Sequence, residues 1–215
     1  PSREDTTDIG AWEHVLHVLA RRAKITTADF ERKQFASKQS TFLSRRFDRH
    51  DGRRVHFASA MTLLGRSDGD DSPASYLDLA GVIARHGAPP ARDLEELWRR
   101  IAFNVCVSNV DDHLRNHGFL LEETGWSLAP AYDLNPVAHG DGLALNISTT
   151  DNAQDLELVR EVAPQFRIKA QRGKALLAEV VSAVQTWEAE AKAAKLTRDS
   201  REHMANAFRL CAKPT

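Results

Sequence analysis

Apolar positions recur at helical spacing in several separated stretches of the sequence. From Ile9 they follow i, i+3/i+4 spacing, which predicts a helix with one buried face. Residues 94–106 have the clearest helical pattern, and residues 177–187 and 204–211 have it again near the C-terminus. We therefore predict a fold dominated by helices, with the chain helical from Asp155 onward.

Shorter alternation of apolar and polar positions predicts two β-hairpins. The first joins residues 30–36 to residues 41–48, with turn-forming residues between them. The second joins residues 118–121 to residues 126–130, with Gly125 in the turn. Strands and helices are thus mixed along the chain, and the predicted fold class is α+β, mostly α-helical.

The connecting segments carry weaker local signals. The sequence RHDGRR at residues 49–54 contains an Asp-Gly turn signal and predicts a polar loop. Residues 56–64 and 75–86 predict two short helices, and residues 143–148 predict a short extended piece. Each of these assignments depends on only a few residues.

The clearest helix also has a predicted start signal. Asp93 and Glu96 have the D-x-x-E spacing of a capping box, in which two side chains bind backbone N–H groups at the start of a helix. The apolar positions from Leu94 to Cys106 follow at helical spacing and lead directly to Asn109. This helix therefore delivers the chain into a polar stretch.

The composition excludes more than it specifies. The 215 residues are 42% hydrophobic and 27% charged, and their formal net charge of −1 gives no bulk reason to expect nucleic acid or a membrane as a partner. No membrane-spanning run and no secretory signal is recognisable. Cys106 and Cys211 lie in apolar helical patterns, where we expect buried, reduced thiols. We expect a cytoplasmic protein and, because the sequence begins at Pro1, the later part of a longer chain.

The polar stretch Asn109–Asp133 carries the candidate chemistry. Asp111 and Asn116 have D-x4-N spacing, a predicted hairpin follows, and Asp133 lies just beyond it. Phosphoryl transfer requires a carboxylate that orients the attacking hydroxyl and oxygen ligands that hold Mg²⁺ against the phosphates. The order of loop, hairpin and Asp matches the catalytic segment of protein kinases. We therefore predict Asp111 as the base and the pair Asn116 and Asp133 as metal ligands.

Other interpretations of the same residues remain open. Taken singly, the three candidate residues could cap a helix or stabilise a turn. His113 and His117 have the H-x3-H spacing of a transition-metal site, although no cysteine lies near them. The five arginines between residues 45 and 54 could bind phosphate, but a solvated face with local acidic partners is the favoured interpretation.

Four segments resemble one family in the correct order. SNVDDHLRNHGFLL followed by LAPAYDLNP resembles the catalytic core of the HipA-type serine/threonine kinases, the toxins of bacterial toxin–antitoxin pairs. Residues 42–57 resemble the hinge segment of that family, residues 8–25 its glutamate-bearing helix and residues 75–83 part of its helical lobe. The resemblance implies a protein-kinase-like C-terminal lobe over residues 49–215, with part of the N-terminal lobe, namely the hinge hairpin and the Glu-bearing helix, over residues 1–48.

The resemblance also implies roles and ligands. Asp111 would be the catalytic base, while ATP and Mg²⁺ would be the cofactors. The residues implied to contact the nucleotide, the phosphates or the metal are Glu13, Arg45, Arg46, Phe47, His113, Asn116, Tyr132 and Asp133. The partners implied are a protein substrate such as an aminoacyl-tRNA synthetase, a helix-turn-helix antitoxin and an N-terminal kinase segment. The enzyme would also phosphorylate itself.

Two parts of the family pattern are absent from this sequence. There is no lysine-bearing strand to pair with Glu13 and no glycine-rich phosphate loop, and Arg45 stands at a hinge position that is often Glu in relatives. We therefore expect this chain alone to have little activity. The alternatives are a small-molecule phosphotransferase, a pseudokinase or half-kinase that binds a partner chain, and a metal-dependent phosphohydrolase built on His113 and His117.

Overall fold

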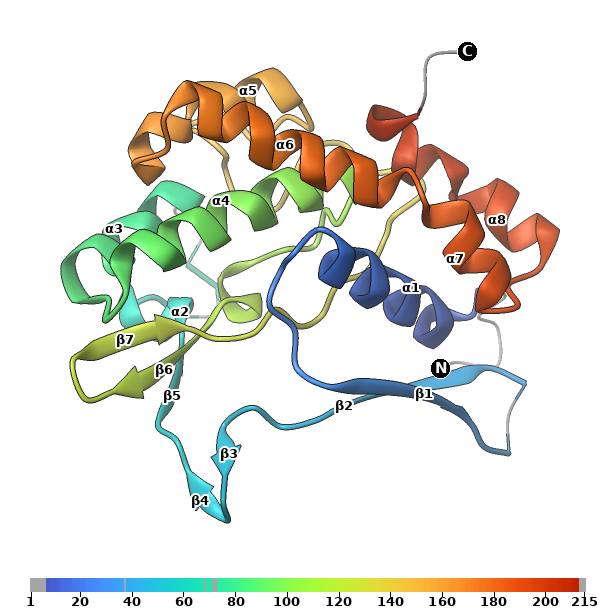
Figure 1. Cartoon of the computed structure of the whole chain (residues 1–215), viewed down its shortest axis with the longest axis horizontal. Helices are drawn as coiled ribbons and strands as arrows, with labels where there is room; N and C mark the ends of the chain where they lie inside the picture. Colours follow the sequence, from blue (N-terminus) through green and yellow to red (C-terminus); the bar gives the residue numbers. More distant parts are fainter. Residues whose placement is uncertain (1–6, 37, 68, 71–72, 213–215) are drawn as a thin grey trace.

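The computed structural model describes residues 7–36, 38–67, 69–70 and 73–212. Figure 1 shows a helical body with β-hairpins along one side. The helices and strands, in chain order, are α1 (Ile9–Arg22), β1 (Phe30–Gln34), β2 (Ser40–Ser44), β3 (Arg49–His50), β4 (Arg53–Arg54), β5 (Phe57–Ser59), α2 (Ala60–Leu63), α3 (Tyr76–His86), α4 (Pro90–Val107), η1 (Leu114–Asn116), β6 (Gly118–Glu122), β7 (Gly125–Leu128), α5 (Leu156–Glu161), η2 (Ala163–Phe166), α6 (Ala170–Val184), α7 (Trp187–Ala193), α8 (Arg198–Met204) and η3 (Ala205–Cys211).

Helix α4 lies at the centre of the helical body. It packs against α3 on one side and α6 on the other, as Figure 1 shows, and most of its residues from Leu94 onward are buried. Its indole Trp98 is fully buried and donates a hydrogen bond of 2.9 Å to the Val159 carbonyl. Because α4 ends at the polar stretch, the rigid core of the molecule fixes where that stretch begins.

Helix α1 and the first hairpin form the N-terminal part of the fold. Asp8 caps α1 by accepting a hydrogen bond from the Ala11 N–H, and the same carboxylate accepts the N–H and hydroxyl of Ser40 at the start of β2. The helix lies very close to the strand, since a side chain at Gly10 would meet the Ser40 carbonyl oxygen. The predicted hairpin is confirmed, with Phe30 of β1 opposite Ser44 of β2.

The second predicted hairpin, β6–β7, is also confirmed, but it has a third strand. Phe57–Ser59 forms β5 and pairs antiparallel with β6, which leaves only the four residues of α2 helical. The prediction of one helix over residues 56–64 was therefore wrong in its first half. The segment is extended because it pairs with Gly118, Phe119 and Leu120. The local hydrophobic pattern cannot predict a partner so distant in the sequence.

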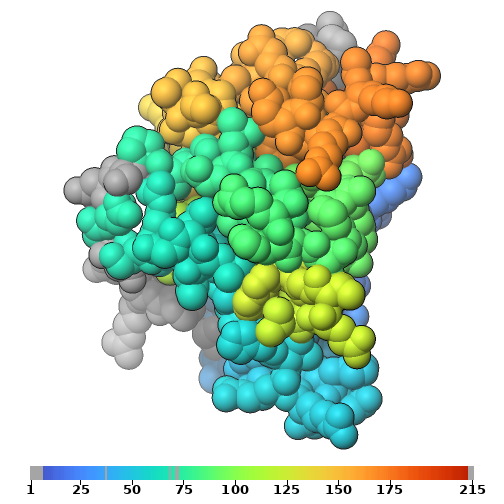
Figure 2. Space-filling view, turned by 90° about the vertical axis from the view of Figure 1, so that its left-hand side faces the viewer, coloured from blue at the N-terminus to red at the C-terminus, as the bar shows by residue number. Residues whose placement is uncertain are grey.

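Two further local predictions were wrong. Residues 49–54 form the small hairpin β3–β4 around the predicted Asp-Gly turn, rather than a loop. Residues 143–148 form no strand; Asn146 makes only an isolated bridge to Ser75. Figure 2 shows the β3–β4 segment below the β6–β7 hairpin, at the bottom of the molecule.

The predicted capping box at Asp93 was also wrong. Helix α4 begins at Pro90, one turn earlier, and Asp93 turns inward to accept a hydrogen bond of 2.6 Å from the Leu128 N–H. Glu96 likewise binds the Thr26 N–H and Arg100. Both carboxylates therefore join α4 to neighbouring segments, and proline replaces a capping side chain at the helix start.

The C-terminal part is helical as predicted, although it is divided into short pieces. The predicted apolar face at residues 204–211 is buried, with Ala205–Cys211 in a 3₁₀-helix. Cys106 and Cys211 are buried free thiols, and the hydrogen bond between them together with burial raises the pKa of Cys106 well above its usual value. Within the described residues, no helix has the length and apolar character needed to cross a membrane. The division of the chain between residues 48 and 49 stays a prediction.

Candidate active site

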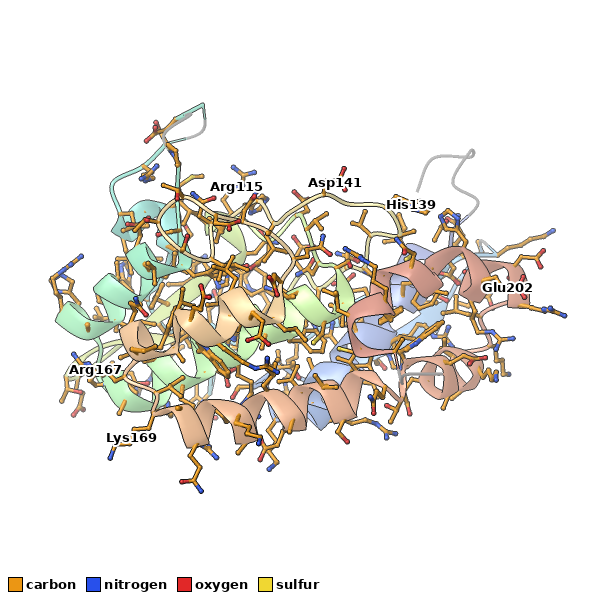
Figure 3. The ribbon with its side chains drawn as sticks, turned by 90° about the horizontal axis from the view of Figure 1, so that it is seen from above. Arg115, His139, Asp141, Arg167, Lys169 and Glu202 are labelled. Carbon is orange, nitrogen blue, oxygen red and sulfur yellow. The ribbon has the colours of Figure 1, made fainter. Side chains whose placement is uncertain are left out.

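The candidate site is built on the loop between α4 and β6. Helix α4 ends at Ser108, a buried residue in the left-handed conformation with a φ of 50°, and its hydroxyl donates to the Ala207 carbonyl. The loop then contains a single 3₁₀ turn before β6 begins at Gly118. A side chain at Gly118 would collide with the ring of Phe57, so the absence of a side chain allows β5 to approach. In Figure 3 Arg115 of this loop projects on the same side of the molecule as Asp141.

The two predicted metal ligands are in direct contact. The Asn116 Nδ2 donates a hydrogen bond of 2.9 Å to Asp133 Oδ2, across a gap of 17 residues. Asp133 Oδ1 accepts a second bond of 3.0 Å from Asn135 Nδ2. Asp133 also has a φ of 56°, a left-handed conformation that is uncommon outside glycine and is enriched at functional sites. The loop and the segment after β7 therefore converge on one carboxylate.

The predicted base lies in the same loop and is accessible. Asp111 is exposed, and among the described residues no side chain makes a hydrogen bond or ion pair with its carboxylate. His113 is not joined to Asp111 by a hydrogen bond; its Nε2 lies 3.2 Å from Arg115, and its buried Nδ1 has no partner in the described part of the chain. Asp111 is thus positioned by its backbone and remains open to a substrate.

Glu13 faces this site from helix α1. It is half-buried, and its pKa is raised to about 7 by burial and then by the negative charge of Asp133. Among the described residues, the Glu13 carboxylate has no hydrogen-bond donor or cationic partner; only its backbone carbonyl is bonded, to His17 Nδ1. The predicted proximity of Glu13 to the rest of the site is therefore supported by its interaction with Asp133.

An aromatic pair links the hinge segment to the site. The ring of Phe47 stacks on Tyr132, with centroids 5.7 Å apart. The Tyr132 hydroxyl donates to the Arg115 carbonyl. Burial raises the pKa of Tyr132 to about 12; the charge of Arg100 opposes this rise, and the charges of Asp112 and Asp133 add to it. These contacts hold the segment that precedes β3 against the residue next to Asp133.

The hinge arginines have acidic partners of their own. The Arg45 N–H already donates to the Asp29 carbonyl, and its side chain is exposed with Asp29 as a distant partner. Arg46 and Arg49 both pair with Asp48, as expected for a solvated face with local acidic partners. The backbone N–H groups of Arg46 and Phe47 form no hydrogen bond among the described residues, so they remain available to a ligand.

Sequence reasoning missed a buried network directly behind the loop. Asp112 Oδ2 accepts hydrogen bonds from Tyr76, Asn104 and His117, and all four residues are buried. The only signal in the sequence was a second aspartate beside Asp111, whose partners in α3 and α4 are defined only by the tertiary fold. The H-x3-H pair is not assembled, because His117 binds Asp112 in the interior.

The oxygen atoms that the site offers fit Mg²⁺ better than a transition metal. No group of three or more His, Cys, Asp or Glu side chains in the described residues is arranged around a metal position. Asn116 and Asp133 supply amide and carboxylate oxygens, which suit Mg²⁺ when phosphates and water complete its coordination. A cavity of about 570 Å³ lies elsewhere, beside α4, and paired ions such as Arg99 and Arg100 line it.

The arrangement of helix α1, the hinge hairpin, the loop and the following Asp defines a protein with a kinase-like fold. HipA of Shewanella oneidensis MR-1, solved with HipB and operator DNA, matches 97% of this chain with a TM-score of 0.79 and 18% identity. The proinflammatory kinase CtkA of Helicobacter pylori matches 96% with a TM-score of 0.57 and 10% identity. The matches cover 56% of the HipA chain and 88% of the CtkA chain.

The family model of the HipA-like C-terminal domain matches residues 1–187. The chain therefore belongs to the HipA-like C-terminal domain family, as its motifs predicted. Among curated proteins, Y4mE of Sinorhizobium fredii (strain NBRC 101917 / NGR234), named as a presumed kinase, is 31% identical over 106 residues. That match spans 45% of this chain and 25% of the relative, so the chain corresponds to only part of the proteins that it resembles.

Proposed function

We propose that this chain carries the catalytic and metal-binding half of an ATP- and Mg²⁺-dependent protein kinase that phosphorylates serine or threonine hydroxyls. The observation that supports the proposal is the contact of Asp133, which follows β7, with Asn116, which lies on the same loop as the exposed Asp111. An accessible carboxylate beside a two-oxygen Mg²⁺ site is the arrangement that phosphoryl transfer to a hydroxyl requires.

Each residue has a role in this proposal. Asp111 orients the attacking hydroxyl and accepts its proton, while Asn116 and Asp133 hold the metal against the phosphates. His113 donates a hydrogen bond to a phosphate oxygen, in line with its unpartnered Nδ1. The bound Mg²⁺ neutralises charge that develops on the transferred phosphoryl group.

The adenine end of the nucleotide is placed against the hinge segment. The backbone N–H groups of Arg46 and Phe47 are suitable donors to a purine ring, whereas that of Arg45 is already engaged. Tyr132 supports Phe47 from below through the aromatic stack. In this proposal the hinge therefore contributes backbone contacts, and the arginine side chains stay paired with nearby acids.

Glu13 is the residue that argues for a contribution from outside the 215 residues. A carboxylate with a pKa of about 7 and a negative neighbour would gain stability from a cation. We propose that a lysine on another segment of the protein, or on a partner chain, supplies that charge and binds the nucleotide phosphates. Without it, we expect binding of Mg²⁺ and nucleotide with little transfer, so robust autophosphorylation by the isolated chain would contradict this part of the proposal.

The targets proposed come from the family alone. A protein hydroxyl, including one on the kinase itself, is the expected acceptor, and an aminoacyl-tRNA synthetase is a candidate. The Shewanella HipA structure includes HipB and operator DNA, which supports a helix-turn-helix antitoxin as a partner here. A small-molecule acceptor is the alternative, and identification of the hydroxyl that receives the γ-phosphate distinguishes the two.

The proposal is tested by transfer of labelled γ-phosphate in the longest natural polypeptide that contains this chain. Replacement Asp111→Ala is expected to lower the transfer rate by about 10²–10⁴-fold, because positioned acid–base groups contribute that much. Asp141→Ala removes an exposed carboxylate from the same side of the molecule and should leave the rate unchanged. Wild-type transfer by Asp111→Ala would exclude the assigned base.

A further inference from the structure

We infer that Asp112 is a positioning residue, whose buried carboxylate holds both ends of the candidate catalytic loop in place. Asp112 directly follows the proposed base Asp111, and its partner His117 directly follows the proposed metal ligand Asn116. The assigned roles of Asp111 and Asn116 rest on the proposed function, whereas the ordering of the loop is a separate property of the fold.

The geometry concentrates three donors on one oxygen. Asp112 Oδ2 accepts from the Tyr76 hydroxyl at 2.6 Å, from Asn104 Nδ2 at 2.7 Å and from His117 Nε2 at 2.8 Å. Tyr76 belongs to α3 and Asn104 to α4, whereas Asp112 and His117 flank the 3₁₀ turn of the loop. We call these four residues the Asp112 hub. Asp112 ties the loop to α3 and α4, and its bond with His117 joins the two sides of the 3₁₀ turn.

The hub is buried, and the lowered pKa of its carboxylate favours the charged form. Its four residues are at most 3% exposed. Burial alone would raise the pKa of Asp112, but His117, Tyr76 and the nearby Arg100 outweigh it, so the pKa lies below its usual value. The pKa of Tyr76 is raised well above its usual value by burial and by Asp112, so its hydroxyl stays a donor. An ionised acceptor with three donors gives short, directional bonds that an apolar core would not provide.

A chain of amide contacts extends the hub to the second metal ligand. Asn104 Oδ1 accepts from Asn109 Nδ2 at 3.1 Å, and Asn109 Oδ1 accepts from the Asn135 N–H at 3.3 Å. Asn135 in turn donates to Asp133 Oδ1 at 3.0 Å. The same buried network thus reaches both segments that meet at the Asn116–Asp133 contact, which explains why two loops 17 residues apart are held in register.

The position of the hub argues for more than a contribution to stability. A buried charged group adds little net stability compared with well-packed apolar residues, so the benefit of the Asp112 carboxylate must be sought in the geometry that it imposes. Here the geometry is imposed on Asp111 and Asn116, which immediately precede the hub residues Asp112 and His117. Outer contacts of this kind orient metal ligands, and their removal typically weakens metal binding by about 10–100-fold.

The test compares two hub variants with a buried control. Tyr76→Phe removes one donor and keeps the ring, and Asp112→Asn removes the charge and keeps the shape. Trp98→Phe removes a buried hydrogen bond elsewhere in α4, to Val159, and controls for a general loss of stability. Tyr76→Phe is the milder change, so it is decisive if Asp112→Asn does not fold.

The first readout is backbone amide hydrogen exchange in residues 109–117. We expect exchange there to accelerate by about tenfold or more in the hub variants, since a broken buried bond costs about 1–3 kcal/mol, and to remain unchanged in Trp98→Phe. Equal exchange in this loop for the hub variants and the control would overturn the inference.

The second readout is the affinity for a non-hydrolysable ATP analogue with Mn²⁺. A fall of about 10–100-fold in Tyr76→Phe, with unchanged affinity in Trp98→Phe, would support positioning of the metal ligands. Unchanged affinity in Tyr76→Phe despite a loosened loop would overturn that link to the site. If wild type binds no metal–nucleotide complex while the hub variants still loosen the loop, the proposed function fails and the positioning of the loop stands.

Discussion

Two carboxylates near the candidate site have opposite surroundings. Asp112 is buried among three hydrogen-bond donors, and its pKa lies below the usual value. Glu13 is half-buried with no donor in the described residues, faces Asp133, and has a pKa of about 7. The candidate catalytic loop therefore carries its own hydrogen-bond donors, whereas helix α1 presents a carboxylate that no described residue compensates.

This difference separates the site into two halves. The loop half, with Asp111, Asn116 and Asp133, is held by contacts within the chain. The α1 half presents Glu13 to the negative charge of Asp133, and in the part of the chain that the structure describes no cation pairs with Glu13. We infer that the loop half can order a metal by itself and that the α1 half requires a positive charge from a ligand or another segment.

The largest loss of stability is expected from replacing Asp112, which fixes the loop that carries Asp111 and Asn116. Asp112→Ala removes the acceptor of three buried donors and leaves His117 without its partner, so the free energy of unfolding should fall by about 3–5 kcal/mol. Urea unfolding followed by fluorescence measures the change. Asp141→Ala should change stability by less than about 0.5 kcal/mol. A loss as small as that of the control would show that the hub adds nothing to stability.

The sequence predicted the components of the site better than their connections. The set of Asp111, Asn116 and Asp133 could be predicted because the loop, the hairpin and the following Asp are consecutive in the chain. The Tyr76–Asp112 bond was not, because it joins residues 36 positions apart whose proximity depends on how α3 packs against α4. Buried polar networks are defined by tertiary packing, which has no short-range periodicity.

The same limit applies to the fold. The amphipathic helices and both hairpins were predicted because their patterns are local. The strand Phe57–Ser59 was mistaken for helix because its partner, β6, lies far along the chain. Asp93 was mistaken for a cap because its true partner is the Leu128 N–H. The wrong predictions of secondary structure and of the helix cap lie where a contact with a residue distant in the sequence overrides the local conformational preference.

The second effect, of intermediate size, is on the pH dependence of stability. Glu13 has a folded pKa of about 7 against an ordinary value of 4.5, so the folded state holds its proton more tightly. Its stabilising contribution is therefore complete below pH 4.5 and is lost as the pH rises through about 7. At pH 8, Glu13→Gln should raise the free energy of unfolding by on the order of 2 kcal/mol, after allowance for solvent screening.

The contribution of Asp112 to stability should depend on pH in the opposite direction. Its folded pKa is lowered, so its contribution is present above the ordinary value of 3.8 and is lost as the pH falls through the folded pKa. Urea unfolding of wild type and Glu13→Gln between pH 4.5 and pH 8 separates the two groups. Parallel stability curves for wild type and Glu13→Gln across this range would contradict the assignment of an uncompensated Glu13.

The smallest loss of stability is expected from replacing Phe47, whose ring stacks on Tyr132 beside the site. Phe47→Leu keeps an apolar side chain but removes the stack on Tyr132, so stability should fall by about 0.5–1.5 kcal/mol. The binding free energy of the adenine nucleotide should weaken by a similar amount, because the hinge backbone is less firmly held. Thermal unfolding and nucleotide titration check the two effects. A nucleotide affinity that is unchanged would place the adenine elsewhere.

The central claim is that Asn116 and Asp133 form a metal–nucleotide site within this chain. Isothermal titration of the chain with a non-hydrolysable ATP analogue, with and without Mg²⁺, tests it most directly. We predict Mg²⁺-dependent binding that weakens by about 10–100-fold in Asp133→Ala and is unchanged in Asp141→Ala. Binding that is equal with and without Mg²⁺, or equal in wild type and Asp133→Ala, would contradict the claim.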